Sequence, residues 1–276
     1  MLARTEDLVA AAAGGRTGIC AFNVITLEHA EAIVAGSAAA QRPVILQISQ
    51  NAVAFHQGEL EPLAAAASSV ATAASVPVAL HLDHVTEPDL LHQAARWFSS
   101  LMFDGSALPF DENVARTAAA VAVGRRDGLW VEGELGEVGG KGGAHRPGVR
   151  TDPVSAKDFV AATGVDGLAV AVGSSHAMTD RSARLDLALI AALRAVQPAV
   201  LVLHGSSGVP DDDLAGAVVQ GITKVNIGTA LNVAYTQAVR EHLGRDQVVV
   251  DPRRPLASAR AAMAGVVEHF ARLLSP

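Results

Sequence analysis

Short apolar segments alternate with longer alanine-rich segments along the whole chain. The apolar segments have four to six residues and little polar alternation, which is typical of strands buried on both faces of a parallel sheet. Their proposed ranges are Gly18–Asn23, Val44–Ser49, Val78–Asp83, Leu101–Asp104, Trp130–Leu135, Leu168–Gly173, Val200–His204 and Thr223–Ile227. The segments between them, such as Glu28–Ala40, Glu59–Ala74 and Asp211–Val219, have polar first residues and high helix propensity. Eight such units predict an α/β fold, a (β/α)8 barrel.

Two segments fall outside the eight units. Met1–Ala13 predicts a helix ahead of the first strand, covering the bottom of the barrel, and Leu256–Leu274 predicts a helix after the eighth unit. Barrels of this class commonly form one domain of about 200 to 250 residues. The 276 residues therefore predict a single TIM-barrel domain over residues 1–276, with an extra N-terminal and an extra C-terminal helix.

Histidines stand at the ends of three predicted strands. His84 follows the third strand in His81-Leu82-Asp83-His84, His176 follows the sixth, and His204 ends the seventh. A single histidine in such a place is ordinarily a hydrogen-bonded core or loop residue. In a (β/α)8 barrel, however, the carboxyl ends of all strands meet on one face, which carries the active site. Three imidazoles with one open position are typical of catalytic zinc, so this pattern predicts a metal site.

The motifs around these histidines resemble those of the class II, zinc-dependent ketose-bisphosphate aldolases, such as fructose- and tagatose-bisphosphate aldolases. The resemblance extends over nearly the whole chain, through the ordered motifs Ala21–Asn23, His81–His84, Asp104–Ser106, Val131–Glu134, Gly173–His176, Leu203–Gly208, Val225–Thr229 and Asp251–Arg253. It implies an enzyme of carbohydrate metabolism such as glycolysis; a cytoplasmic location is the default expectation, because the sequence shows neither a membrane span nor a signal peptide. The implied reaction is cleavage of the C3–C4 bond of a phosphorylated ketose, most simply fructose 1,6-bisphosphate, to dihydroxyacetone phosphate and an aldehyde. Tagatose bisphosphate and a modified sugar phosphate are close alternatives.

The resemblance also assigns roles around the metal. It implies one catalytic Zn²⁺ per subunit, and it allows a monovalent cation beside it. Asp83 would exchange the proton of the C4 hydroxyl, although a carboxylate next to a ligand can also merely orient a histidine. Asp104 and Glu134 would form an alternative second metal position. Asn23 and Ser49 would contact the substrate, although polar residues at strand ends are often helix caps.

A phosphate site is predicted after the seventh and eighth strands, because these loops and a nearby helix N-terminus bind phosphate in many barrels. The residues are Gly205, Ser206, Ser207, Asn226, Ile227, Gly228 and Thr229. The resemblance adds Arg253, reaching a phosphate across a subunit contact, and thereby implies a homodimer or homotetramer. An arginine in that position is otherwise usually a surface ion-pair partner.

Two departures from the family pattern bear on the substrate, and the first lies after the sixth strand. Ala177 stands where bisphosphate-binding members carry a phosphate-contacting glycine, and Asp180 stands at the position of a lysine. Asp180 would repel a phosphate, although Arg181 or Arg184 could compensate.

The second departure is the glycine-rich segment 139–150, which we interpret as a mobile lid. It lacks the glutamate that handles the C3 proton in the family. His145 could take that role, the substrate could differ, or the segment could be an ordinary solvated loop.

Charge and composition exclude several classes of function. The net charge of −7 and the pI near 5.8 argue against nucleic-acid binding. No apolar run approaches the ~20 residues of a membrane span, and the first residues lack the order of a signal peptide. Cys20 lies in an apolar strand and is expected to be an inert core residue.

Lysine content bears on the mechanism, because a Schiff-base aldolase needs a lysine inside the barrel. The chain has only Lys141, Lys157 and Lys224, and only Lys224 lies in a predicted strand. A metal mechanism is therefore favoured. Two other hypotheses remain open: a zinc-binding barrel with weak catalysis that acts as a partner subunit, and a zinc hydrolase using metal-bound water.

Overall fold

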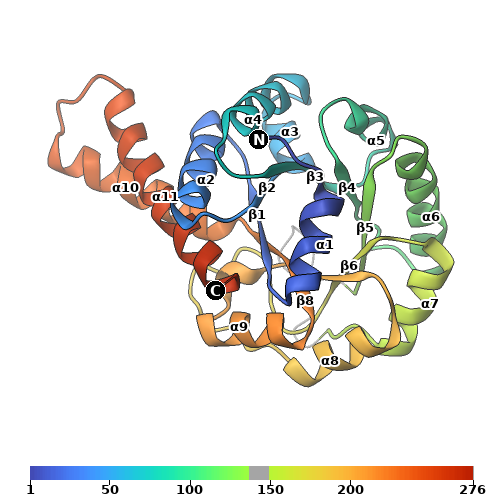
Figure 1. Ribbon diagram of the computed structural model, residues 1–276. Coiled ribbons are helices and arrows are strands. Elements are labelled where there is room, and N and C mark those ends of the chain that lie inside the picture. The colour runs from blue at the N-terminus through green and yellow to red at the C-terminus, as the bar shows by residue number, and fades with distance from the viewer. Residues whose placement is uncertain (137–148, 276) are drawn as a thin grey trace.

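The chain forms a closed barrel of eight parallel strands surrounded by helices, as the sequence predicts (Figure 1). The computed structural model describes residues 1–136 and 149–275. The strands are β1 (Ile19–Asn23), β2 (Val44–Ser49), β3 (Val78–Val85), β4 (Ser100–Phe103), β5 (Trp130–Leu135), β6 (Gly167–Val170), β7 (Val200–Leu203) and β8 (Ile222–Ile227). Each strand pairs with its neighbours in sequence, and β8 closes the barrel on β1. Their carboxyl ends therefore share one face.

Helices follow the strands and cover the outside of the barrel. They are α2 (Leu27–Ala40), α3 (Gln50–Phe55), α4 (Glu61–Ala73), α5 (Pro88–Gln93), the 3₁₀ turn η1 (Ala94–Arg96), α6 (Phe110–Arg126), α7 (Pro153–Thr163), α8 (Leu187–Val196), the 3₁₀ turn η2 (Ser206–Gly208), α9 (Asp211–Gln220), α10 (Thr229–Arg245) and α11 (Arg253–Leu274). Small buried alanines let the helices approach the strands closely, as Ala64, Ala67 and Ala71 do on α4. The short helix α3 was not anticipated from the pattern. It starts directly after β2, where the Ser49 hydroxyl accepts the Ala52 amide at 3.2 Å.

The predicted N-terminal helix is α1 (Thr5–Gly15), which lies across the amino-terminal end of the barrel (Figure 1). It begins later than predicted because the first residues run beside β3, where the Ala3 amide donates to the Val78 carbonyl at 2.8 Å. Leu8 and Val9 pack against the apolar residues of the barrel interior. The helix therefore closes the bottom, opposite to the strand ends that carry the histidines.

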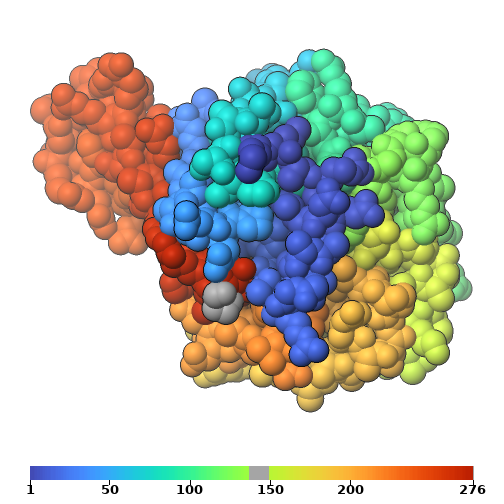
Figure 2. All heavy atoms as spheres, viewed as in Figure 1, coloured from blue at the N-terminus to red at the C-terminus, as the bar shows by residue number. Residues whose placement is uncertain are grey.

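The C-terminal helix α11 is also longer than predicted, because it begins at Arg253 instead of Leu256. Its apolar face includes Met263, Val267 and Phe270 and packs against α2. The hairpin of α10 and the first part of α11 projects away from the barrel (Figures 1 and 2). Within α10 only Leu231 is buried, so most of this projecting helix faces solvent.

Two smaller expectations can be compared with the described residues. Cys20 is only 3% exposed in β1, and burial raises the pKa of its thiol, so it is the inert core residue that was expected. None of the described helices combines the length and the apolar character needed to cross a membrane.

Candidate active site

The three predicted metal ligands meet at the carboxyl ends of the strands. His84, His176 and His204 offer nitrogen atoms that all lie within 4.8 Å of one another. Their ring centroids are 4.8 to 5.6 Å apart, and their planes are nearly perpendicular, at 74 to 90°. Apolar packing of the rings would not by itself bring one nitrogen of each ring to a common point. This arrangement fits one divalent ion bound by three imidazoles.

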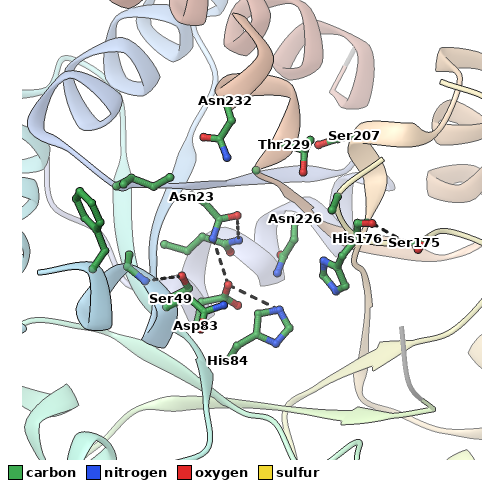
Figure 3. Close-up of a pocket in the computed structure, with 18 residues that line it drawn as sticks. Asn23, Ser49, Asp83, His84, Ser175, His176, Ser207, Asn226, Thr229 and Asn232 are labelled. Atoms are coloured by element: carbon green, nitrogen blue, oxygen red, sulfur yellow. Dashed lines mark hydrogen bonds and ion pairs between the residues drawn. The ribbon is translucent and has the colours of Figure 1, made fainter. Parts of the chain in front are cut away.

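A backbone irregularity brings Asp83 and His84 to the same cavity. Consecutive residues of a regular strand point to opposite faces of the sheet. Strand β3 shifts its register against β4 between Leu82 and Val85, and His84 has a left-handed φ of 51°. A bulge of this kind re-aims a side chain. Consequently the carboxylate and the imidazole both line the cavity (Figure 3).

The hydrogen bonds of His204 leave its other nitrogen suited to a metal. Nε2 lies 2.8 Å from Glu132 Oε1. An ionised carboxylate only accepts, so Nε2 must carry the proton and donate it. Nδ1 is then a lone-pair atom; it is buried and finds no hydrogen-bond partner within residues 1–136 and 149–275. Burial also lowers the pKa of His204, which favours the neutral form that binds metals.

A buried ion pair keeps Glu132 ionised beneath the site. Burial alone would raise the pKa of Glu132, but the Lys224 ammonium, 2.8 Å away, and the His204 N–H together lower it to about 2. Lys224 also donates to Asn226 Oδ1 at 2.7 Å. Both members of the pair are fully buried. Lys224 is thus committed to this pair and does not line the cavity, in agreement with a metal mechanism over a Schiff base.

Asp104 holds the second imidazole. Its Oδ2 accepts a hydrogen bond from His84 Nδ1 at 2.9 Å, and its Oδ1 accepts from the hydroxyl of Ser106 at 2.7 Å. This is the carboxylate–histidine arrangement that orients metal ligands. His84, Asp104 and Glu134 also form a second group whose ligand atoms lie within 4.8 Å. A second metal position there stays a prediction.

Asp83 lies beside the three histidines and is 1% exposed. Its Oδ2 accepts from Asn23 Nδ2 at 3.3 Å and lies 3.9 Å from His84 Nε2. The amide oxygen of Asn23 accepts in turn from Gln47 at 3.0 Å. The carboxylate is therefore fixed by a chain of amides from β1 and β2. Gln47 was missed in the sequence, although a glutamine inside an otherwise apolar strand was a signal.

The loops after β7 and β8 are shaped to bring backbone amides together. Gly205 has a φ of 66°, and a Cβ there would come within 2.5 Å of the Ser175 carbonyl carbon, so only glycine fits. The hydroxyl of Ser207 accepts from the Ala230 amide at 3.0 Å, which ties the η2 turn to the N-terminus of α10. Helix N-termini with such donors favour anions. A phosphate in this position stays a prediction.

A cavity of about 370 Å³ lies between Asp83, His84, His176 and the loops after β7 and β8. Of the predicted site residues, it is lined by Asn23, Ser49, Asp83, His84, His176, Ala177, Gly205, Ser207, Asn226, Gly228 and Thr229. It is also lined by residues that were not predicted, namely Ile25, Gln47, Asn51, Ala52, Phe55, Ser175 and Asn232. Most of these residues follow strands β1 and β2 or lie one turn into a helix, where the sequence pattern does not show which side chains face a cavity.

Several predicted residues do not line the cavity. Ser206 and Ile227 are buried, and the Ser206 hydroxyl donates to the Asn226 carbonyl, so they shape the loops from below. The Arg253 side chain is 88% exposed and paired with Asp251 at the start of α11. A phosphate contact by Arg253 would require a second subunit and stays a prediction. His145, the lid candidate, lies outside the described residues.

The proposed compensation by Arg181 or Arg184 is wrong. The Arg181 guanidinium donates to the Val209 carbonyl and to Asp211. Arg184 lies 3.2 Å from Asp213 and is otherwise solvent-exposed. Both side chains point to the outer layer and neither lines the cavity, because the acidic first turn of α9 attracts them.

Ala177 has a backbone conformation that ordinarily requires glycine. Its φ is 59°, in the left-handed region that favours glycine. A glycine at this position would thus be free of strain, whereas the alanine adds a methyl group to the cavity wall.

Comparisons with known proteins agree with this geometry. The family model described as fructose-bisphosphate aldolase class II matches residues 3–275. The crystal structure of the YdjI aldolase from Escherichia coli K12 is 31% identical, with a TM-score of 0.85, over 100% of this chain and 98% of that chain. A Coccidioides immitis protein designated as a fructose-1,6-bisphosphate aldolase is 29% identical, with a TM-score of 0.87, over 98% and 96% of the two chains.

The fructose-bisphosphate aldolase of Campylobacter jejuni is 23% identical, with a TM-score of 0.82 over 99% of this chain and 95% of that chain, and supports the barrel fold alone. The family model spans nearly every residue, and the structure brings together the three histidines that the sequence motifs predict, with Asp83 beside them. This chain therefore belongs to the class II fructose-bisphosphate aldolase family and is an aldolase, a carbon–carbon lyase.

Proposed function

We propose that this protein is a zinc-dependent aldolase that breaks the C3–C4 bond of a phosphorylated ketose and releases dihydroxyacetone phosphate and an aldehyde. Fructose 1,6-bisphosphate is the simplest substrate to test first. The observation that carries the proposal is the convergence of three imidazoles from β3, β6 and β7 beside the buried carboxylate of Asp83.

The residues present fit a resident metal ion. His84 and His204 each have one ring nitrogen held by a carboxylate, Asp104 or Glu132, which leaves the opposite side of each ring for a metal. His176 completes the set from the loop after β6. Three neutral imidazoles without thiolates suit zinc and leave room for a substrate oxygen. A divalent ion bound there would act as a Lewis acid toward the carbonyl of the ketose.

Asp83 is the residue that moves the proton in the proposed reaction. In cleavage, its carboxylate accepts the proton of the C4 hydroxyl, C4 becomes the aldehyde carbon, and the electron pair of the C3–C4 bond remains with C3. C3 must then receive a proton from another group to complete dihydroxyacetone phosphate. Asn23 and Gln47 fix the Asp83 carboxylate during the transfer through their chain of hydrogen bonds. In the direction of synthesis, Asp83 returns the proton to the new hydroxyl.

The substrate phosphate is proposed to bind the amides after β7 and β8. Gly205, Ser207 and Thr229 line this end of the cavity, next to the N-terminus of α10. No charged side chain is needed for a phosphate held by backbone donors and a helix N-terminus. This end of the cavity would fix C1, and the metal and Asp83 would then face C2 to C4.

The proposal is tested by removal and return of the metal. Treatment with a chelator should abolish cleavage of ketose phosphates, and added Zn²⁺ should restore it. Asp83→Ala should lower kcat by at least about 100-fold, because it removes the proton acceptor, while zinc binding by the three histidines is retained. Cleavage that survives both chelation and Asp83→Ala would contradict the proposal.

Two alternatives remain distinguishable by the same preparations. A barrel that serves as a partner subunit would bind zinc but turn over no ketose mono- or bisphosphate in a panel. A zinc hydrolase would cleave esters or amides without any ketose.

A further inference from the structure

One end of the cavity has an apolar wall that the metal site does not use. Ile25, in the loop after β1, and Ala52 and Phe55, on helix α3 after β2, line the cavity there. Ala52 is 5% exposed, whereas Phe55 is 69% exposed. The phenyl ring thus has apolar surface that a bound group could cover.

Hydrogen bonds fix this wall in place. His56, next to Phe55, lies with Nε2 2.7 Å from the carbonyl oxygen of Ile25, so the ring N–H can hold the β1 loop against α3. The Ala52 amide donates to Ser49 at 3.2 Å. The wall is therefore formed before a ligand binds, and this amide at the start of α3 is already engaged within the chain.

The proposed orientation of the substrate places the carbons beyond C4 at this wall. In Figure 3, Ser207 and Thr229 lie together on one side of Asn226, whereas Ser49 and Asp83 lie on the other side. A phosphate near Ser207 and Thr229 fixes C1, and the C4 hydroxyl must lie near Asp83 to give up its proton. The carbons beyond C4 then extend past Asp83 toward Ser49 and α3, where the apolar wall stands.

Within the described residues of one subunit, this end of the cavity offers no cation to a second phosphate. Among the described residues that line the cavity there is no lysine or arginine, and the carboxylate of Asp83 would repel a dianion. The two nearby arginines of the β6 loop, Arg181 and Arg184, are held by Asp211 and Asp213. The polar groups that do line this end include the amide of Asn51, which matches a hydroxyl better than a phosphate.

Resting on the aldolase function proposed above, we infer that the wall formed by Ile25, Ala52 and Phe55 is a subsite for an uncharged, partly apolar aldehyde end. The substrate is then a ketose 1-phosphate that lacks a second phosphate. Its cleavage gives dihydroxyacetone phosphate and a short uncharged aldehyde, with the same proton transfer to Asp83 and no further reactant.

The zinc-loaded protein tests this in the direction of synthesis. We would measure kcat/KM for dihydroxyacetone phosphate with lactaldehyde, which ends in a methyl group, and with glyceraldehyde 3-phosphate. We expect kcat/KM for lactaldehyde to be higher by about tenfold or more, since no lysine or arginine among the described residues that line the cavity compensates the charge of the phosphate. A preference for glyceraldehyde 3-phosphate would overturn the inference.

Variants of Phe55 test whether the preference for the uncharged aldehyde depends on this side chain. Phe55→Ala should lower kcat/KM for lactaldehyde about fivefold and change glyceraldehyde 3-phosphate little, because only the former covers the ring. Phe55→Arg should shift the ratio toward glyceraldehyde 3-phosphate. Phe110→Ala is the matched control, since Phe110 is also exposed, at 41%, but does not line the cavity. An unchanged ratio in both Phe55 variants would overturn the inference.

A binding measurement separates this inference from the proposed chemistry. Zinc-loaded Asp83→Asn should not turn over, and calorimetric titration should show fructose 1-phosphate binding at least as tightly as fructose 1,6-bisphosphate. Tighter binding of the bisphosphate would contradict the subsite while the aldolase function stands. Failure to cleave or form any ketose phosphate would instead overturn the aldolase function, and this inference with it.

Discussion

At the scale of single residues, the site depends on which nitrogen of each imidazole is already engaged. Glu132 takes the N–H of His204 and Asp104 contacts Nδ1 of His84, so each ring presents its other edge to the centre of the cluster. The sequence predicted His84, Asp104 and His204 as site residues, but it did not single out Glu132, which lies two residues before Glu134. A carboxylate inside a strand could have been noticed only as a polar residue in an apolar segment.

Glu132→Gln should weaken zinc binding about 10- to 100-fold, because a neutral amide orients His204 less firmly and lowers its basicity. Competition with a chromophoric chelator measures the zinc affinity, and circular dichroism checks the fold. Glu112→Gln is the control, because Glu112 forms only an exposed pair with Arg116. Unchanged zinc affinity in Glu132→Gln would show that His204 needs no carboxylate.

Ala177→Gly should raise the free energy of unfolding by roughly 0.5 to 1 kcal/mol, because relief of the left-handed conformation outweighs the added freedom of the unfolded chain. Ala177 has a φ of 59°, in the left-handed region where alanine is strained and glycine is not. Urea denaturation of both proteins, with zinc and with chelator, measures the difference. A loss of stability would mean that the methyl group of Ala177 contributes packing that the positive φ does not reveal.

At the scale of elements, two irregular backbone segments decide which side chains reach the cavity. The bulge in β3 turns Asp83 and His84 toward one cavity, and the unexpected helix α3 places Phe55 at its mouth. Neither follows from the apolar pattern, because the pattern counts side-chain alternation and a bulge breaks that alternation. The predicted bounds of the regular strands, in contrast, are close to the observed ones, and β2 and β5 match in full.

Gly205→Ala tests the loop between β7 and η2. Its Cβ would meet the Ser175 backbone at 2.5 Å in a conformation with positive φ, so we expect a loss of about 1 to 3 kcal/mol of stability and weaker binding of dihydroxyacetone phosphate. Gly244→Ala is the control, since a Cβ there meets nothing within 4 Å and alanine favours the helix α10. Thermal unfolding and calorimetric titration with dihydroxyacetone phosphate measure the two effects. Equal behaviour of the two variants would contradict the role of the glycine.

At the scale of the whole molecule, hydrogen bonds run through the barrel interior from its bottom to His81, which lies next to Asp83 of the site. Thr5 at the start of α1 contacts Ser100 at 2.6 Å, Ser100 contacts His81 at 2.8 Å, and His81 Nε2 lies 3.9 Å from Asp83. The helix that closes the bottom is thus linked to the groups at the top. His81 is completely buried, and burial together with the nearby Lys224 ammonium lowers its pKa to about 3.

Because His81 is buried and its pKa is lowered, we expect the free energy of unfolding to decrease in acid. Between the unfolded pKa of about 6.5 and the folded pKa of about 3, the unfolded chain binds a proton that the folded chain does not. Stability should therefore fall as the pH falls through this range, by up to about 1.4 kcal/mol per pH unit from His81. Urea denaturation of the metal-free protein from pH 7 to pH 4 measures the slope. In His81→Gln the slope should be smaller; an equal slope would assign the acid sensitivity to other groups.

The sequence by itself determined the barrel, the outer helices and the convergence of three histidines with Asp83 at one face. Periodicity is a local property, and the strand ends of a closed parallel barrel share one face whatever the details of packing. Only the tertiary structure decided that Glu132 and Lys224 form a pair under His204, that Arg181 and Arg184 turn to α9, and that Ile25 and Phe55 share a wall. Those contacts join residues far apart in the chain, and their directions follow from packing and charge in three dimensions.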